Sequence, residues 1–152
     1  MKMARERAII PGKWARACWL AQQWCIAMNT VIPPRTTRRI LLVDDDVELL
    51  AGLERIFRGA GQDATACSSF EVGKQLLRAT AYDVLITDVR LGSFNGLQLA
   101  LLARDLYPRI RLIVFSGFDD PVLRVEAEQV GAVYVLKPVP GSVLLELATR
   151  GD

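Results

Sequence analysis

Short runs of consecutive apolar residues alternate along the chain with segments in which leucines recur at helical spacing. The run Ile40–Val43 is typical of a strand buried on both faces of a sheet, and three similar runs follow it, while 63–67 shows the strand pattern only weakly. The expected strands are 39–43, 63–67, 82–87, 110–115 and 133–136. This alternation predicts an α/β domain, a doubly wound five-stranded parallel sheet of the (βα)5 type with helices on both faces.

Several helix boundaries carry recognisable signals. Ser68 or Ser69 is expected to cap the helix that follows the second strand, and Asp120 before Pro121 is a strong helix start. Ser142 is expected to cap the last, short helix. The segment 89–96, after the third strand, is expected to be a loop because it contains glycine, serine and asparagine.

Composition excludes several classes of protein. Of the 152 residues, 51% are hydrophobic, which is enough for a sizeable core and excludes global disorder. No run of about 20 apolar residues is present, so no spanning helix and no membrane partner are expected. Histidine is absent, which excludes a Ser-His-Asp triad and histidine metal sites. Three cysteines without zinc spacing indicate a reducing compartment, and we expect the cytoplasm.

Charge divides the chain into two parts. Residues 1–39 carry eight basic residues and one acidic residue, whereas the remainder carries eleven basic and sixteen acidic residues. All three tryptophans also lie in the first part, and Pro33-Pro34 indicates a linker. We therefore expect a basic N-terminal extension at 1–37 and a domain at 38–152. The extension is interpreted as disordered or as translated upstream sequence with the true start at Met28, rather than as a segment that binds lipid or nucleic acid.

Polar residues stand where the predicted strands end. Asp44 and Asp45 follow the first strand, Asp88 the third, Ser116 the fourth and Lys137 the fifth. Ligands of doubly wound sheets bind at the carboxyl ends of the strands, so these side chains are expected to meet at one edge.

The side chains expected at that edge predict phosphoryl transfer with the help of a bound metal ion. Three clustered carboxylates repel one another, and a hard cation, Mg²⁺ or Mn²⁺, offsets that repulsion. A carboxylate that faces a phosphoryl group can attack it and form an acyl phosphate. Lys137 would supply a cation and Ser116 a hydroxyl donor. Spacing alone leaves open which aspartate attacks.

At these residues the chain resembles the response-regulator receiver domain of two-component signalling. The matching segments are 40–46, 82–88 with Gly96 eight residues later, 112–117 and 131–138. The resemblance covers about 38–150 and implies a flavodoxin-like fold with strand order 2-1-3-4-5. It also implies a phosphoacceptor signalling domain rather than an enzyme, apart from self-catalysed phosphoryl transfer and dephosphorylation.

The resemblance implies a role for each site residue. Asp88 would accept a phosphoryl group from a sensor histidine kinase or a histidine phosphotransfer protein. Asp45 and Asp88 would bind Mg²⁺ directly, Asp44 through water, and the backbone carbonyl of Arg90 would complete the protein ligands.

Three further residues would transmit the change. Ser116 would move to bind the phosphoryl group, Lys137 would pair with it, and Tyr134 would turn inward as an aromatic switch. For Tyr134, an ordinary half-buried aromatic on an edge strand is an equal alternative.

The expected output is a contact with another protein. No output domain follows in this sequence, so we expect a stand-alone receiver that acts through the face formed by the fourth helix, fifth strand and fifth helix. We expect no nucleic-acid partner, and a monomer or weak dimer.

Two alternatives stay open at this point. One is a phosphatase of the haloacid-dehalogenase type, with Asp44 as nucleophile and Asp119-Asp120 as the later acidic pair, although that pair precedes Lys137. The other is a receiver-like binding module that is never phosphorylated.

Overall fold

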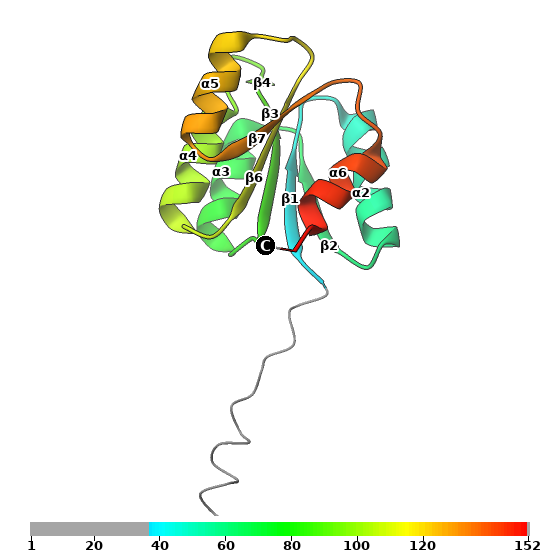
Figure 1. The fold of residues 1–152 in the computed structure, drawn as a ribbon. Coiled ribbons are helices and arrows are strands. Elements are labelled where there is room, and N and C mark those ends of the chain that lie inside the picture. The colour runs from blue at the N-terminus through cyan, green and yellow to red at the C-terminus, as the bar shows by residue number, and fades with distance from the viewer. Residues whose placement is uncertain (1–36, 152) are drawn as a thin grey trace, which may run out of the picture. The chain divides into compact units, whose positions relative to one another are not determined.

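A computed structural model describes residues 37–151 (Figure 1), and all but the last residue of the expected extension lies outside this range. Five parallel strands form one sheet in the order β2-β1-β3-β6-β7, and a two-stranded antiparallel ribbon stands apart from it. The strands are β1 (Arg39–Val43), β2 (Asp63–Cys67), β3 (Val84–Asp88), β4 (Arg90–Leu91), β5 (Phe94–Asn95), β6 (Arg111–Ser116) and β7 (Ala132–Leu136). The helices are α2 (Val47–Gly59), α3 (Phe70–Ala79), α4 (Leu97–Leu106), α5 (Pro121–Gln129) and α6 (Gly141–Thr149).

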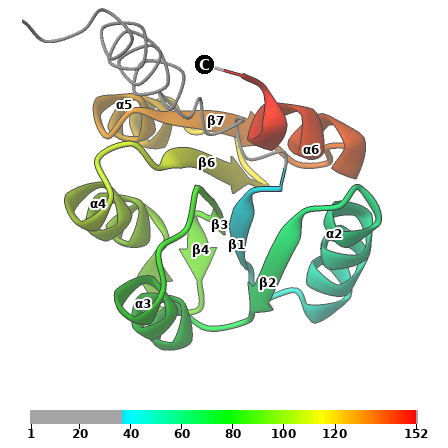
Figure 2. The ribbon, with the colours of Figure 1, turned by 90° about the horizontal axis from the view of Figure 1, so that it is seen from below.

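Helices cover the sheet on both faces. Figures 1 and 2 show α3, α4 and α5 on one face and α2 with α6 on the other. Counting only the five strands of the main sheet in chain order gives 2-1-3-4-5, so the predicted fold class and strand order are confirmed. Among residues 37–151, no helix is long and apolar enough to cross a membrane.

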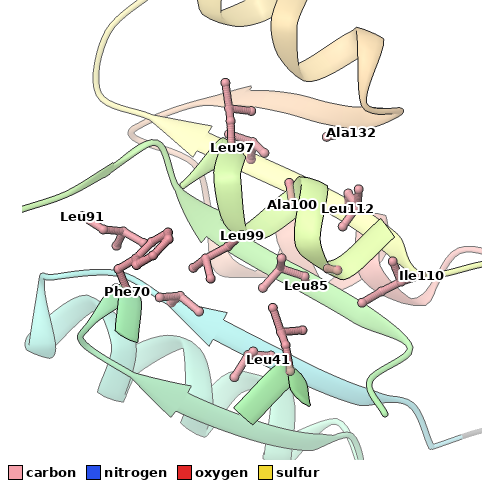
Figure 3. Close-up of a cluster of buried hydrophobic side chains, with 14 of the residues drawn as sticks. Leu41, Phe70, Leu85, Leu91, Leu97, Leu99, Ala100, Ile110, Leu112 and Ala132 are labelled. Carbon is pink, nitrogen blue, oxygen red and sulfur yellow. The ribbon is translucent and has the colours of Figure 1, made fainter. Parts of the chain in front are cut away.

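Each face of the sheet carries its own hydrophobic core. Alternate residues of β1 point to opposite faces, so Leu41 joins the core under α3, α4 and α5, and Leu42 joins the core under α2 and α6. Figure 3 shows the first core, where Leu85 and Leu112 continue the row of Leu41 from strand to strand. Because both faces are covered, the central strands β1, β3 and β6 contain runs of consecutive apolar residues, which is the pattern that predicted them. The edge strand β2 lacks such a run because it contains Asp63 and Thr65.

The helix starts confirm two of the three predicted caps. The Ser69 hydroxyl accepts the Val72 N–H at 3.2 Å, and the Asp120 carboxylate accepts the Val122 N–H at 2.9 Å. The prediction for Ser142 is wrong. The α6 helix begins at Gly141 because the Pro140 carbonyl already accepts the first N–H groups of the turn, which places Ser142 inside the helix.

The segment after β3 is more ordered than the expected loop. Residues 90–95 form a hairpin of two short strands that turns at Gly92, whose φ is +61°. The Phe94 ring stacks on the Phe70 ring of α3, with 4.6 Å between ring centroids. The predicted third strand also began too early: its ladder with β1 begins at the Ile40–Val84 pair.

Candidate functional site

The carboxyl ends of four strands meet at one edge of the sheet. Asp44 directly follows β1, Asp88 ends β3, Ser116 ends β6 and Lys137 directly follows β7. Strand order reverses between β1 and β3, which is where doubly wound sheets bind their ligands. The structure therefore brings together the residues that the sequence placed at this edge.

Three carboxylates form the acidic part of the site. One oxygen each from Asp44, Asp45 and Asp88 lies within 4.8 Å of the others. Asp44 is fully buried and Asp88 is 8% exposed, whereas Asp45 faces solvent. A close all-oxygen donor set that opens to water on one side suits a hard divalent cation such as Mg²⁺, which keeps several of its own waters. Within residues 37–151, no other group of three acidic, histidine or cysteine side chains could hold a metal ion.

Lys137 is the cation of the site. Its Nζ lies 2.7 Å from Oδ2 of Asp44 and 3.4 Å from Oδ2 of Asp88. The same ammonium lies 4.4 Å from the centroid of the Phe115 ring. Lys137 thus bridges the two buried aspartates, and its shortest ion pair is with Asp44 rather than with Asp88.

The pKa of the Asp88 carboxyl is raised above its ordinary value. Burial is the largest cause, and the charge of Asp44 acts in the same direction. The charge of Lys137 and the hydrogen bonds from Lys137 and from the Arg90 N–H oppose this shift. Asp88 is therefore held where its negative charge is unfavourable, and a cation that binds there would relieve the cost.

The three consecutive aspartates that follow β1 have different roles. Asp44 accepts the Asp46 N–H on Oδ1 at 2.8 Å, which orients its carboxylate and leaves Oδ2 for Lys137. The Asp46 carboxylate accepts the Glu48 and Leu49 N–H groups and caps α2. Asp46 is thus a structural cap, and only Asp44 and Asp45 belong to the acidic cluster.

Gly96 allows the hairpin to close behind Asp88. Its N–H donates to the Val89 carbonyl at 2.7 Å. A Cβ at this position would clash with the main-chain oxygen of Asp88 and lie 2.8 Å from the Thr87 hydroxyl. The main chain at Gly96 therefore lies directly against the main chain at Asp88, and only glycine fits at position 96 without a shift of Asp88.

Two of the three expected switch residues, Ser116 and Tyr134, share a main-chain partner. The Ser116 hydroxyl accepts the Phe118 N–H at 3.1 Å and donates to the Phe118 carbonyl at 3.0 Å. The Tyr134 hydroxyl donates to that carbonyl at 2.7 Å. The Arg90 guanidinium also lies over the exposed Phe118 ring, 4.6 Å from the ring centroid. The sequence analysis missed Phe118, whose role rests mainly on main-chain atoms that leave no signature in residue type.

The acidic pair of the phosphatase alternative lies outside the site. Asp119 forms an ion pair with Arg124 at 2.6 Å, and Asp120 caps α5. Neither belongs to the carboxylate cluster found within residues 37–151, so the phosphatase alternative lacks its later acidic pair at this site.

Comparison with known proteins identifies the family. Residues 40–149 match the family described as the response regulator receiver domain. This chain belongs to that family. The response regulator protein FleR of Pseudomonas aeruginosa is 31% identical over 113 residues, which are 74% of this chain and 24% of FleR. The DNA-binding transcriptional regulator NtrC of Escherichia coli is 35% identical over 103 residues, covering 65% of this chain and 21% of NtrC.

The receiver thus spans about a quarter of the length of the curated relatives it matches. Solved structures agree on the fold. A response regulator protein from Burkholderia pseudomallei, crystallised with a phosphorylated aspartic acid, calcium ion and citrate, has a TM-score of 0.69 and 25% identity over 73% of this chain and 66% of its own. A CheY-like receiver domain protein from Methanospirillum hungatei has a TM-score of 0.69 and 27% identity over 72% of this chain and 89% of its own.

Proposed function

We propose that this receiver accepts a phosphoryl group on Asp88 from the phosphohistidine of a sensor histidine kinase or a histidine phosphotransfer protein, and that this switches a protein–protein contact. The observation that carries the proposal is the convergence of Asp88 with Asp44, Asp45 and Lys137 in a chain of the receiver family. The reaction consumes one phosphoryl group per domain, so the domain acts as a phosphoacceptor in two-component signalling.

The proposed transfer is an in-line displacement. A carboxylate oxygen of Asp88 attacks phosphorus, the phosphorus–nitrogen bond of phosphohistidine breaks, and its electron pair stays on the imidazole nitrogen. The product is an aspartyl phosphate. Lys137, with Nζ 3.4 Å from Asp88, can shift from Asp44 toward the negative charge of the phosphoryl group.

The acidic cluster fits Mg²⁺, or Mn²⁺, as the cofactor of this reaction. We assign Asp45, Asp88 and the Arg90 carbonyl as direct ligands and Asp44 as a ligand through water. When bound, the cation supplies positive charge beside the phosphoryl oxygens. Exposed Asp45 provides the side of the cluster from which a hydrated ion can enter.

Phosphorylation is proposed to break the contacts at Phe118. To bind a phosphoryl oxygen, the Ser116 hydroxyl must leave the Phe118 main chain. The Phe118 carbonyl would then lose one of its two hydroxyl donors, and the Tyr134 hydroxyl would be released with the loop. A local charge change at Asp88 is thereby coupled to the surface of β7.

The output surface is proposed to be the α5–β7–α6 face. Val122 is 65% exposed and Val125 is 51% exposed on this face. Leu123 and Val139 are half-buried against the two cores and contribute less surface. A protein partner that covers the valines would bury apolar area next to Tyr134.

Labelled acetyl phosphate as a small-molecule donor tests this function. We expect incorporation of label that requires Mg²⁺, stops with a chelator, and falls sharply in Asp45→Asn. Exposed Asp105 on α4 offers the matched control, and Asp105→Asn should retain full labelling. Metal-independent labelling, or equal labelling of both variants, would contradict the assigned site. A partner that binds wild type and Asp88→Asn equally before and after phosphodonor treatment would favour a binding module.

A further inference from the structure

A second charged region lies at the opposite end of the sheet. The amino ends of β6 and β7 and the carboxyl end of α6 enclose a cleft of about 350 Å³, which we call the arginine cleft. Three arginines line it, Arg109, Arg111 and Arg150, together with the aliphatic residues Ile110, Val133 and Leu147. Figure 2 views the domain from this end. Among residues 37–151, no aspartate or glutamate lines the cleft.

Main-chain carbonyl groups hold the guanidinium groups in place. Arg111 donates to the carbonyls of Leu147 and Arg150 at 2.9 and 2.7 Å, and Arg38 reaches the same Arg150 carbonyl at 3.1 Å. These hydrogen bonds fix the guanidinium groups of Arg111 and Arg38 against the carboxyl end of α6.

The cleft is positively charged at its rim. The exposed Arg109 makes no hydrogen bond or ion pair within the described range. Arg150 has an ion pair with Glu146 at 3.6 Å, in which both side chains are largely exposed, and such a pair is readily exchanged for another anion. Arg109 also borders a neighbouring pocket of about 540 Å³, whose lining includes the acidic Asp83. The basic lining without an acidic residue is therefore confined to the arginine cleft.

We propose that the arginine cleft binds a short acidic segment of a partner protein in which carboxylates alternate with aliphatic side chains. Guanidinium groups bind carboxylates through two parallel hydrogen bonds, and Val133 and Leu147 offer apolar contact beside them. The chain's own residues 1–36 are an unsuitable occupant because their charge has the same sign. Nucleic acid is disfavoured because no aromatic side chain on which a base could stack lines this cleft.

The position of the cleft separates its binding from phosphorylation. Asp88 lies at the carboxyl end of β3, whereas the cleft lies at the amino ends of β6 and β7. An acidic segment bound there leaves the phosphorylation site open, so one partner could hold the receiver while a kinase modifies it. This inference goes beyond the proposed function and survives if that function fails.

Fluorescence anisotropy with a labelled peptide that alternates glutamate with leucine tests the proposal on the full chain. We expect binding that weakens as salt rises and that falls about tenfold or more in Arg109→Glu. Arg55, exposed on α2 and outside the cleft lining, supplies the matched control, so Arg55→Glu should bind within about twofold of wild type. Asp88→Asn should bind normally, and circular dichroism should show that all three variants are folded.

Three results would overturn the proposal. These are equal losses in the Arg109→Glu and Arg55→Glu variants, undiminished binding of the peptide's glutamine analogue, and tighter binding of a labelled oligonucleotide that Arg109→Glu abolishes. The last result would assign the cleft to nucleic acid.

Discussion

The two ends of the sheet both concentrate charge, and they hold it differently. At the carboxyl end, Asp44 and Asp88 are buried beside each other with Lys137 between them, so each charge depends on its neighbours. At the amino end, Arg109 and Arg150 are exposed, and the ion pair of Arg150 is with Glu146, which is itself largely exposed. Buried, mutually dependent charges respond strongly when one group changes, whereas exposed charges respond weakly.

This difference indicates that a signal is more readily generated at the carboxyl end of the sheet than at the amino end. On the proposed mechanism, a phosphoryl group on Asp88 would change the partners of both Lys137 and Ser116, because Lys137 already contacts Asp88 and Ser116 would leave the Phe118 main chain. An anion bound at the arginine cleft would pair with exposed arginines, and we expect the fold to stay unchanged.

Gly96→Ala should have the largest effect, because its Cβ would strike the main-chain oxygen of Asp88. We expect a loss of about 3 kcal/mol in the free energy of unfolding, measured by urea titration, and loss of phosphorylation. Gly117→Ala is the matched control, since a Cβ at Gly117 meets no atom within 4 Å. Equal behaviour of the two variants would show that the hairpin does not constrain Asp88.

Lys137→Met should leave buried Asp44 without its cation. The expected loss is about 2 kcal/mol, less than for a fully buried pair because 24% of the Lys137 side chain is exposed. Adding Asp44→Asn to Lys137→Met should restore most of the lost stability in the same urea titration. If the double variant were as unstable as Lys137→Met, the Asp44–Lys137 pair would not explain the effect.

Asp88→Asn should stabilise the metal-free protein at neutral pH by on the order of 1 kcal/mol. Burial raises the pKa of Asp88, so the folded state holds this proton more tightly than the unfolded state does. The stability contributed by protonated Asp88 is therefore complete below the ordinary aspartate pKa and is lost as pH rises through the raised value.

Urea midpoints measured with a chelator across the acid range check this sign. The gain in Asp88→Asn over wild type should grow as pH rises, whereas exposed Asp105→Asn should track wild type. A gain that shrank with rising pH would mean that the pKa of Asp88 is lowered in the folded state.

Arg111→Met should have the smallest effect. It removes hydrogen bonds to the carbonyls of Leu147 and Arg150, with an expected cost of about 1 kcal/mol in thermal or urea unfolding. Phosphorylation should be unchanged because Arg111 lies at the other end of the sheet. A loss of phosphorylation in Arg111→Met as large as that expected for Asp45→Asn would erase the distinction between the two ends.

Prediction from sequence succeeded where local pattern and topology coincide. The continuous apolar runs located the strands, and parallel topology placed Asp44, Asp88, Ser116 and Lys137 at one edge. Ser69 and Asp120 were readable as caps because an N-cap depends only on the next few residues.

Prediction from sequence failed for features that leave no local sequence pattern. The two-residue strands Arg90–Leu91 and Phe94–Asn95 are too short to show alternation, so the hairpin was expected only as a loop. The arginine cleft joins Arg109 to Arg150, which are distant in sequence and carry no motif. The preference of Lys137 for Asp44 over Asp88 depends on side-chain distances of 2.7 and 3.4 Å that composition and spacing do not encode.

The most direct test of the central claim is to locate the modified residue. The protein is treated with acetyl phosphate and Mg²⁺, reduced with borohydride so that an aspartyl phosphate becomes homoserine, and sequenced by tandem mass spectrometry. We expect homoserine at position 88. We expect no homoserine there when the metal is omitted or when Asp88→Asn is treated. Homoserine at position 44 or 45, or undiminished modification in Asp88→Asn, would contradict it.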